Sequence, residues 1–120
     1  MSQSIVVLVV EDEPLVRLDI ADCLSDEGFD VIEAANADEA INALKANDRI
    51  RLLFTDVDMP GSMDGLKLAT LASERWPPVS IIVTSGHRLV EISDIPDGSV
   101  FFAKPYSHAA IVASVREMVA

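Results

Sequence analysis

The chain has 120 residues, 50% of them hydrophobic and 24% charged, which predicts a single domain over residues 1–120 with a buried core. Nine Lys and Arg against 20 Asp and Glu give a formal charge of −11, which excludes nonspecific attraction to nucleic-acid phosphates and anionic lipids. Because it has one cysteine, no apolar run of membrane-spanning length and no signal-peptide pattern, we expect a cytoplasmic protein that binds neither nucleic acid nor membrane.

The first half of the chain alternates strand-like and helix-like segments. Residues 5–10 form an unbroken, mostly β-branched apolar run, which is typical of a strand buried on both faces in a parallel sheet. Apolar side chains at helical spacing then run from Pro14, a favoured first helical residue, to Gly28, which stands where a helix C-cap is wanted. A weaker strand is expected at 30–34, and Asn36 begins a capping-box pattern that predicts the next helix.

The second half continues the alternation. A strand is expected at 51–55, and the helix after it has to end before Pro77. Strands at 79–84 and 100–103 follow, and Ser107 is placed to cap a last helix. Strands that alternate with helices predict an α/β fold, here a doubly wound, five-stranded parallel sheet with helices on both faces.

Polar side chains stand at the carboxyl ends of four expected strands, where ligands of such sheets bind. In strand order they are Glu11 and Asp12, Asp56, Thr84, and Lys104. Two carboxylates about 4 Å apart repel by about 4 kcal/mol at an effective dielectric near 20, and a hard cation such as Mg²⁺ would offset this repulsion. The pattern indicates phosphoryl chemistry with Mg²⁺, in which a carboxylate can be the covalent nucleophile while the metal and Lys104 neutralise the phosphoryl oxygens and the Thr84 hydroxyl donates to them.

On these residues the sequence resembles the receiver domains of two-component response regulators, among them the single-domain chemotaxis regulator. The matching segments are Glu11-Asp12, 54–60 with 63–65, 84–86 and 101–105. The resemblance implies a flavodoxin-like sheet of strand order 2-1-3-4-5. It also implies that Asp56 accepts a phosphoryl group from a phosphohistidine on a sensor histidine kinase or a histidine phosphotransfer protein.

Further site roles follow from the same resemblance. Glu11, Asp12, Asp56 and the backbone carbonyl of Asp58 would surround Mg²⁺, and the peptide between Lys104 and Pro105 would be cis. Phosphorylation would draw the Thr84 hydroxyl inward and turn Phe101, which would change the face that a downstream protein partner reads. Phe101 stands where a tyrosine is commoner in the family.

The sequence departs from the family in two segments. The loop after the expected phosphoacceptor holds Gly61 and Ser62 where the family usually has one residue, so the loop is one residue longer. Pro96 and Gly98 interrupt the segment 86–99, where the family has its fourth helix, so we expect that helix to be short or irregular.

Two other functions stay open. One is a pseudo-receiver, a binding scaffold that never takes phosphate, although the intact set of site residues disfavours it. The other is an aspartyl-phosphate phosphatase, because Asp56-Val57-Asp58 after an apolar strand resembles the nucleophile motif of haloacid-dehalogenase-type enzymes. The leading hypothesis is a signalling module that is no enzyme beyond promoting its own phosphorylation and dephosphorylation. Pairing with a second copy also stays open.

Overall fold

The expected strands pair in parallel in the order β2-β1-β3-β4-β5 in the computed structural model, which describes residues 4–61, 63–86 and 90–120. The strands are β1 (Val6–Val10), β2 (Asp30–Ala34), β3 (Ile50–Asp56), β4 (Ser80–Ser85) and β5 (Val100–Ala103). The α-helices found in those ranges are α1 (Pro14–Asp26), α2 (Ala37–Ala46), α3 (Gly65–Arg75) and α4 (His108–Val119). The predicted fold class and strand order are confirmed.

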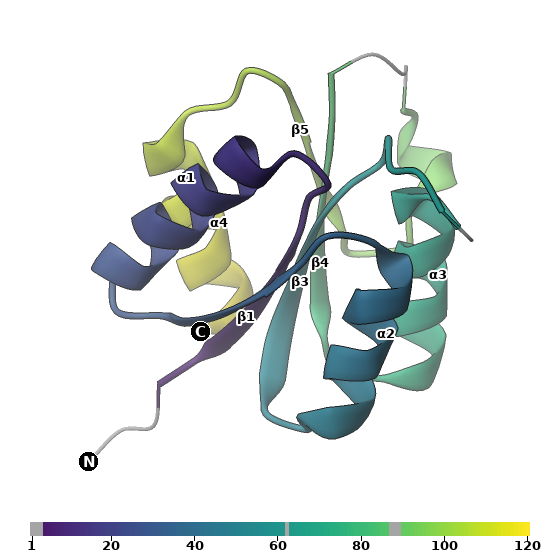
Figure 1. The fold of residues 1–120 in the computed structure, drawn as a ribbon, viewed down its shortest axis with the longest axis horizontal. Coiled ribbons are helices and arrows are strands. Elements are labelled where there is room, and N and C mark those ends of the chain that lie inside the picture. Colours follow the sequence, from purple (N-terminus) through teal and green to yellow (C-terminus); the bar gives the residue numbers. More distant parts are fainter. Residues whose placement is uncertain (1–3, 62, 87–89) are drawn as a thin grey trace.

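Helices cover both faces of the sheet, with α1 and α4 on one side and α2 and α3 on the other (Figure 1). Successive residues of a strand point to opposite faces, so Val7 and Val9 pack into the core under α1 and α4. Leu8 and Val10 pack into the core under α2 and α3. All five residues of β1 are buried, which is why this strand is apolar at every position.

Local capping signals set several helix ends. The Asn36 side chain accepts a hydrogen bond of 2.9 Å from the backbone N–H of Glu39 at the start of α2. The Ser107 hydroxyl accepts one of 3.3 Å from the N–H of Ala110 at the start of α4. Pro14 is the first residue of α1, as predicted. None of the helices in the described part of the chain is long and apolar enough to cross a membrane.

The connection between β4 and β5 contains little helix. Over 90–99 the only helical element is a 3₁₀-helix, η1 (Ile92–Asp94). Gly98 has a φ of +83°, a conformation that favours glycine, and the Ser99 N–H donates to the Pro96 carbonyl. The expected short or irregular helix is confirmed over this stretch. Residues 87–89 of the same segment, and Ser62 of the longer loop, lie outside the described residues.

Candidate functional site

The strand order brings the predicted site residues to one edge of the sheet. Glu11 follows β1, Asp56 ends β3, Thr84 lies in β4 and Lys104 follows β5. The sheet pairs β1 with β3, β3 with β4 and β4 with β5, and Asp56 is the direct register partner of Thr84. Four segments that are far apart in the chain therefore meet at their carboxyl ends, where ligands of parallel sheets bind.

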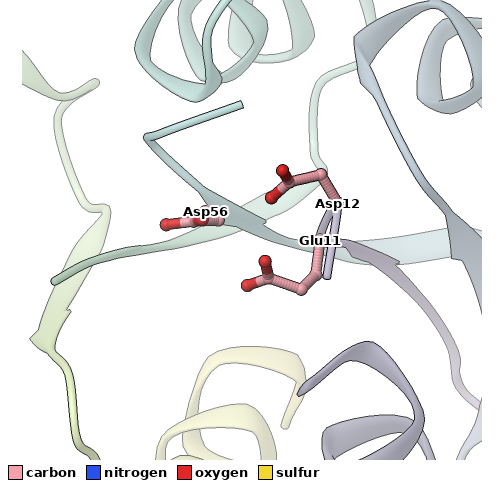
Figure 2. A group of neighbouring side chains, drawn as sticks. All are labelled: Glu11, Asp12 and Asp56. Carbon is pink, nitrogen blue, oxygen red and sulfur yellow. The ribbon is translucent and has the colours of Figure 1, made fainter. Parts of the chain in front are cut away.

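Three carboxyl groups converge at this edge. Glu11, Asp12 and Asp56 each offer an oxygen, and these oxygens lie within 4.8 Å of one another. In Figure 2 the carboxyl groups of Glu11 and Asp12 both turn toward Asp56. Glu11 is 1% exposed and Asp56 is 4% exposed, whereas Asp12 is half-buried. Water therefore screens the first two charges poorly.

Lys104 bridges the two buried carboxylates. Its Nζ lies 3.0 Å from Oε2 of Glu11 and 3.2 Å from Oδ2 of Asp56. Burial alone would lower the pKa of Lys104, but the hydrogen bond to Glu11 and the charges of both carboxylates outweigh it, so its pKa is raised. The peptide between Lys104 and Pro105 is cis, as the resemblance implied.

One lysine does not neutralise the cluster. Burial raises the pKa of Glu11, and the hydrogen bond from Lys104 lowers it by less. Burial likewise raises the pKa of Asp56, against the opposing effects of Lys104 and a backbone hydrogen bond with Asp58. Both groups are thus held in surroundings that disfavour their ionised forms, and a further cation would relieve this penalty.

Two buried polar atoms of the site have capacity for a further ligand. Oδ1 of Asp56 and the hydroxyl oxygen of Thr84 have no hydrogen-bond partner within the ranges that the structure describes. A buried polar atom without a hydrogen-bond partner lowers folding stability by about 1–3 kcal/mol, so a bound group that contacts it would be favourable. A hard cation suits the carboxylate oxygen, and an anionic oxygen suits the hydroxyl. The donor set of Glu11, Asp12 and Asp56 therefore fits Mg²⁺, which prefers oxygen ligands.

The remaining predicted residues lie around this centre. The carboxylate of Asp58 accepts a hydrogen bond of 3.3 Å from the Ser85 hydroxyl, and its backbone carbonyl stays a predicted ligand. Phe101 is half-buried in β5 and packs against the core under α2 and α3. Its movement on phosphorylation stays a prediction.

Sequence reasoning assigned no role to Ser85 or Gly65, although both stand in the segments that resemble the family. The structure places Ser85 next to the site through its bond to Asp58. Gly65 begins α3 with its backbone against the carbonyl of Asp56, where a side chain would overlap. The Ser85 contact joins the ends of two neighbouring strands, and the close approach of Gly65 depends on how the connection after β3 folds back, so no periodic pattern predicts either.

A groove of about 640 Å³ borders Lys104 and Gly86 and continues along α1 past Leu15 and Val16 to Tyr106. Leu15 is 81% exposed, so the rim of the groove is accessible to solvent. The lining of this groove includes Lys104 but none of the three clustered carboxyl groups.

The raised pKa values predict how stability changes with pH. The folded state keeps protons on Glu11 and Asp56 at pH values where the unfolded chain has released them, so stability falls as pH rises through the raised pKa values. Asp56→Asn should therefore raise the free energy of unfolding at pH 7 without Mg²⁺ by about 1 kcal/mol, which corresponds to a melting temperature roughly 3–6 °C higher. It should also flatten the pH dependence of stability.

Thermal denaturation measures this effect. It is followed by circular dichroism from about pH 4 to about pH 8 with a metal chelator in the buffer. Asp22→Asn is the matched control, because it removes the same charge from an exposed position of α1. A melting temperature of Asp56→Asn at or below that of the control would contradict the prediction.

Comparisons with known proteins agree with this geometry. The family model described as "Response regulator receiver domain" matches residues 7–116. "Putative response regulator NtrX-like" of Rickettsia bellii is 35% identical over 110 residues, which cover 88% of this chain and 23% of that protein. "Transcriptional regulatory protein PdtaR" of Mycobacterium tuberculosis is 31% identical over 113 residues, which cover 92% of this chain and 54% of that protein.

Solved structures are similar over nearly the whole chain. A response regulator receiver protein from Sinorhizobium medicae superposes with a TM-score of 0.89 and 29% identity over 98% of this chain and 95% of that one. The curated relatives are longer, since the chain spans 23% of one and 54% of the other. The likeness therefore concerns one module that recurs in proteins of different lengths.

Proposed function

The chain belongs to the response regulator receiver domain family, and on this basis we propose that it is a phosphorylation-dependent signalling module with Asp56 as its phosphoacceptor. One observation carries the proposal: a buried oxygen of Asp56 without a hydrogen-bond partner in the described residues lies within the Glu11–Asp12–Asp56 cluster. Lys104 stands beside the same carboxylate, at 3.2 Å. A nucleophile, a cation site and a positive charge for the phosphoryl oxygens are thus together.

The phosphoryl transfer uses the side chains of this cluster. A carboxylate oxygen of Asp56 forms a bond to phosphorus, the bond between phosphorus and the donor's histidine nitrogen breaks, and that nitrogen keeps the electron pair and takes a proton from solvent. Lys104 Nζ and the Thr84 hydroxyl donate to the phosphoryl oxygens. Glu11, Asp12, Asp56 and the carbonyl of Asp58 would hold Mg²⁺, which would neutralise charge on the transferred group.

The partners that we propose follow from family membership. The donor is a sensor histidine kinase or a histidine phosphotransfer protein, and the groove beside Lys104 leaves space for its approach. Phosphorylation would act through Thr84 and Phe101 on a face read by a downstream protein. The free thiol of Cys23 fits the reducing cytoplasm, which we propose as the location.

The proposal is tested by intact mass. Wild type and Asp56→Asn are incubated with Mg²⁺ and acetyl phosphate, and we expect one added phosphoryl group on wild type and none on the variant. Asp22→Asn, which changes an exposed carboxylate of α1, should take up the group as wild type does. The absence of an adduct from both acetyl phosphate and a phosphohistidine donor would favour the scaffold.

A second assay separates the module from an enzyme. We propose that the protein catalyses only its own phosphorylation and dephosphorylation, so it should release no phosphate from p-nitrophenyl phosphate above the rate of Asp56→Asn. Turnover that is lost in Asp56→Asn would instead support the phosphatase function.

A further inference from the structure

The side chain of Arg17 links the turn after β1 to the neighbouring strand β2. Its Nη1 donates a hydrogen bond of 2.8 Å to the backbone carbonyl of Glu11. Its Nε lies 3.3 Å from Oε1 of Glu33 in β2, and the Arg17 side chain is only 20% exposed. One guanidinium therefore ties two chain segments together at the edge of the carboxylate cluster.

Helix geometry explains why Arg17 reaches this turn. Side chains of a helix lean toward its N-terminus, and Arg17 is in the first turn of α1, with its backbone N–H donating to the Glu13 carbonyl at 2.9 Å. Its side chain therefore extends back over the residues that precede the helix. The planar guanidinium has several donors in a fixed geometry, so it can bond a carbonyl and a carboxylate together.

Glu11 makes hydrogen bonds through its backbone N–H, its backbone carbonyl and both carboxylate oxygens. Its backbone N–H donates to the Ala34 carbonyl at 3.1 Å, and its carbonyl accepts from Arg17. Its Oε1 accepts from the Glu13 N–H at 3.2 Å, and its Oε2 accepts from Lys104 at 3.0 Å. Of these four bonds, only the one from Arg17 holds the carbonyl of the peptide that joins Glu11 to Asp12.

We propose that Arg17 is a positioning residue for the cation site: it holds the Glu11–Asp12 turn so that the two carboxylates meet Asp56 at ligand spacing. The inference rests on the proposed function. Without Arg17, the turn would have to be ordered against carboxylate repulsion when the cation binds, and that cost would weaken binding. Removing groups that orient metal ligands typically lowers metal affinity about 10–100-fold.

The test is titration calorimetry with Mg²⁺ alone, at a temperature where each variant is folded by circular dichroism. Arg17→Gln should bind Mg²⁺ about tenfold more weakly than wild type. Arg17→Lys keeps the charge and one donor group, so it should recover part of the affinity. Such a rescue would not follow if Arg17 only contributed to overall stability.

Arg116→Gln is the matched control. Arg116 Nη2 donates to the backbone carbonyl of Glu27 at 3.2 Å and to the Oε1 of Glu27 at 2.8 Å. The substitution therefore removes the same kind of double contact at the other end of α1. We expect its Mg²⁺ affinity to equal that of wild type. Unchanged affinity in Arg17→Gln, or an equal loss in Arg116→Gln, would overturn the inference.

The two proposals fail differently. A wild type that takes up phosphate and binds Mg²⁺ while Arg17→Gln binds equally well would overturn the role of Arg17 and leave the proposed function standing. A wild type that does not bind Mg²⁺ would overturn both. A melting temperature of Arg17→Gln near that of Arg116→Gln, combined with weaker Mg²⁺ binding in Arg17→Gln alone, would support the positioning role.

Discussion

Lys104→Met should lower the free energy of unfolding at pH 7 by about 2–3 kcal/mol without Mg²⁺, which is a fall of about 8–12 °C in melting temperature. The substitution keeps the length of the side chain and removes the charge that lies 3.0 Å from Glu11 and 3.2 Å from Asp56. Two carboxylates with 2% and 5% exposed side chains would then face each other without a cation. Breaking a buried pair by removing one partner is costly because the other charge stays buried.

The loss of stability in Lys104→Met should depend on pH. Lys104 lowers the pKa of Glu11 and of Asp56, so its removal raises both pKa values further. A raised carboxyl pKa in the folded state means that stability falls as pH rises through it. The deficit of Lys104→Met should therefore shrink near pH 5 and grow toward pH 8, and the additional change Asp56→Asn should recover much of it.

Urea denaturation of the variants across this pH range measures both effects. Lys67→Met is the control, because it removes the same charge from an exposed position of α3. A deficit of Lys104→Met that equals that of Lys67→Met, or that does not change with pH, would contradict the prediction.

Gly65→Ala should destabilise the fold by about 3 kcal/mol or more and abolish Mg²⁺ binding. Gly65 begins α3, and its backbone N–H donates to the Val57 carbonyl at 3.0 Å. A Cβ at this position would overlap the carbonyl of Asp56 and come within 2.9 Å of the Cα of Val57. Both obstacles are backbone atoms, so α3 or the end of β3 has to move, and Asp56 moves with it.

Gly86→Ala provides the comparison. A Cβ there would lie 3.5 Å from Cδ and 3.6 Å from Cβ of Lys104, which are ordinary van der Waals contacts with a side chain. We expect this variant to stay within about 1 kcal/mol of wild type. Urea denaturation and Mg²⁺ calorimetry measure both variants. Wild-type stability in Gly65→Ala would contradict the close approach, whereas failure of that variant to fold would agree with it.

Short-range patterns were enough to predict most of the fold. The apolar run before Glu11 forms a strand that is buried at every position. Asn36 and Ser107 cap the helices that they were expected to cap. Strand ends were less certain: β3 covers Ile50–Asp56 where 51–55 was expected, since a strand extends as far as its neighbours continue to pair with it.

The candidate site was also largely predictable. Polar residues at the ends of apolar runs, together with the resemblance to receiver domains, selected Glu11, Asp12, Asp56, Thr84 and Lys104, and the structure brings these five together. Such a prediction is feasible because the carboxyl ends of parallel strands share one edge of the sheet.

The sequence alone determined the elements, the fold class and the residue types at the strand ends, because hydrophobic periodicity and capping act over a few neighbouring residues. The atomic contacts around the site come from the tertiary structure. Lys104 bonds Glu11 from 93 positions away, and Gly65 lies against the carbonyl of Asp56. Arg17 reaches both Glu11 and Glu33. The Lys104–Glu11 and Arg17–Glu33 contacts depend on strand order and helix placement, which arise only when the sheet has assembled. The contacts of Gly65 with Asp56 and of Arg17 with Glu11 depend on how each helix starts against the strand end before it.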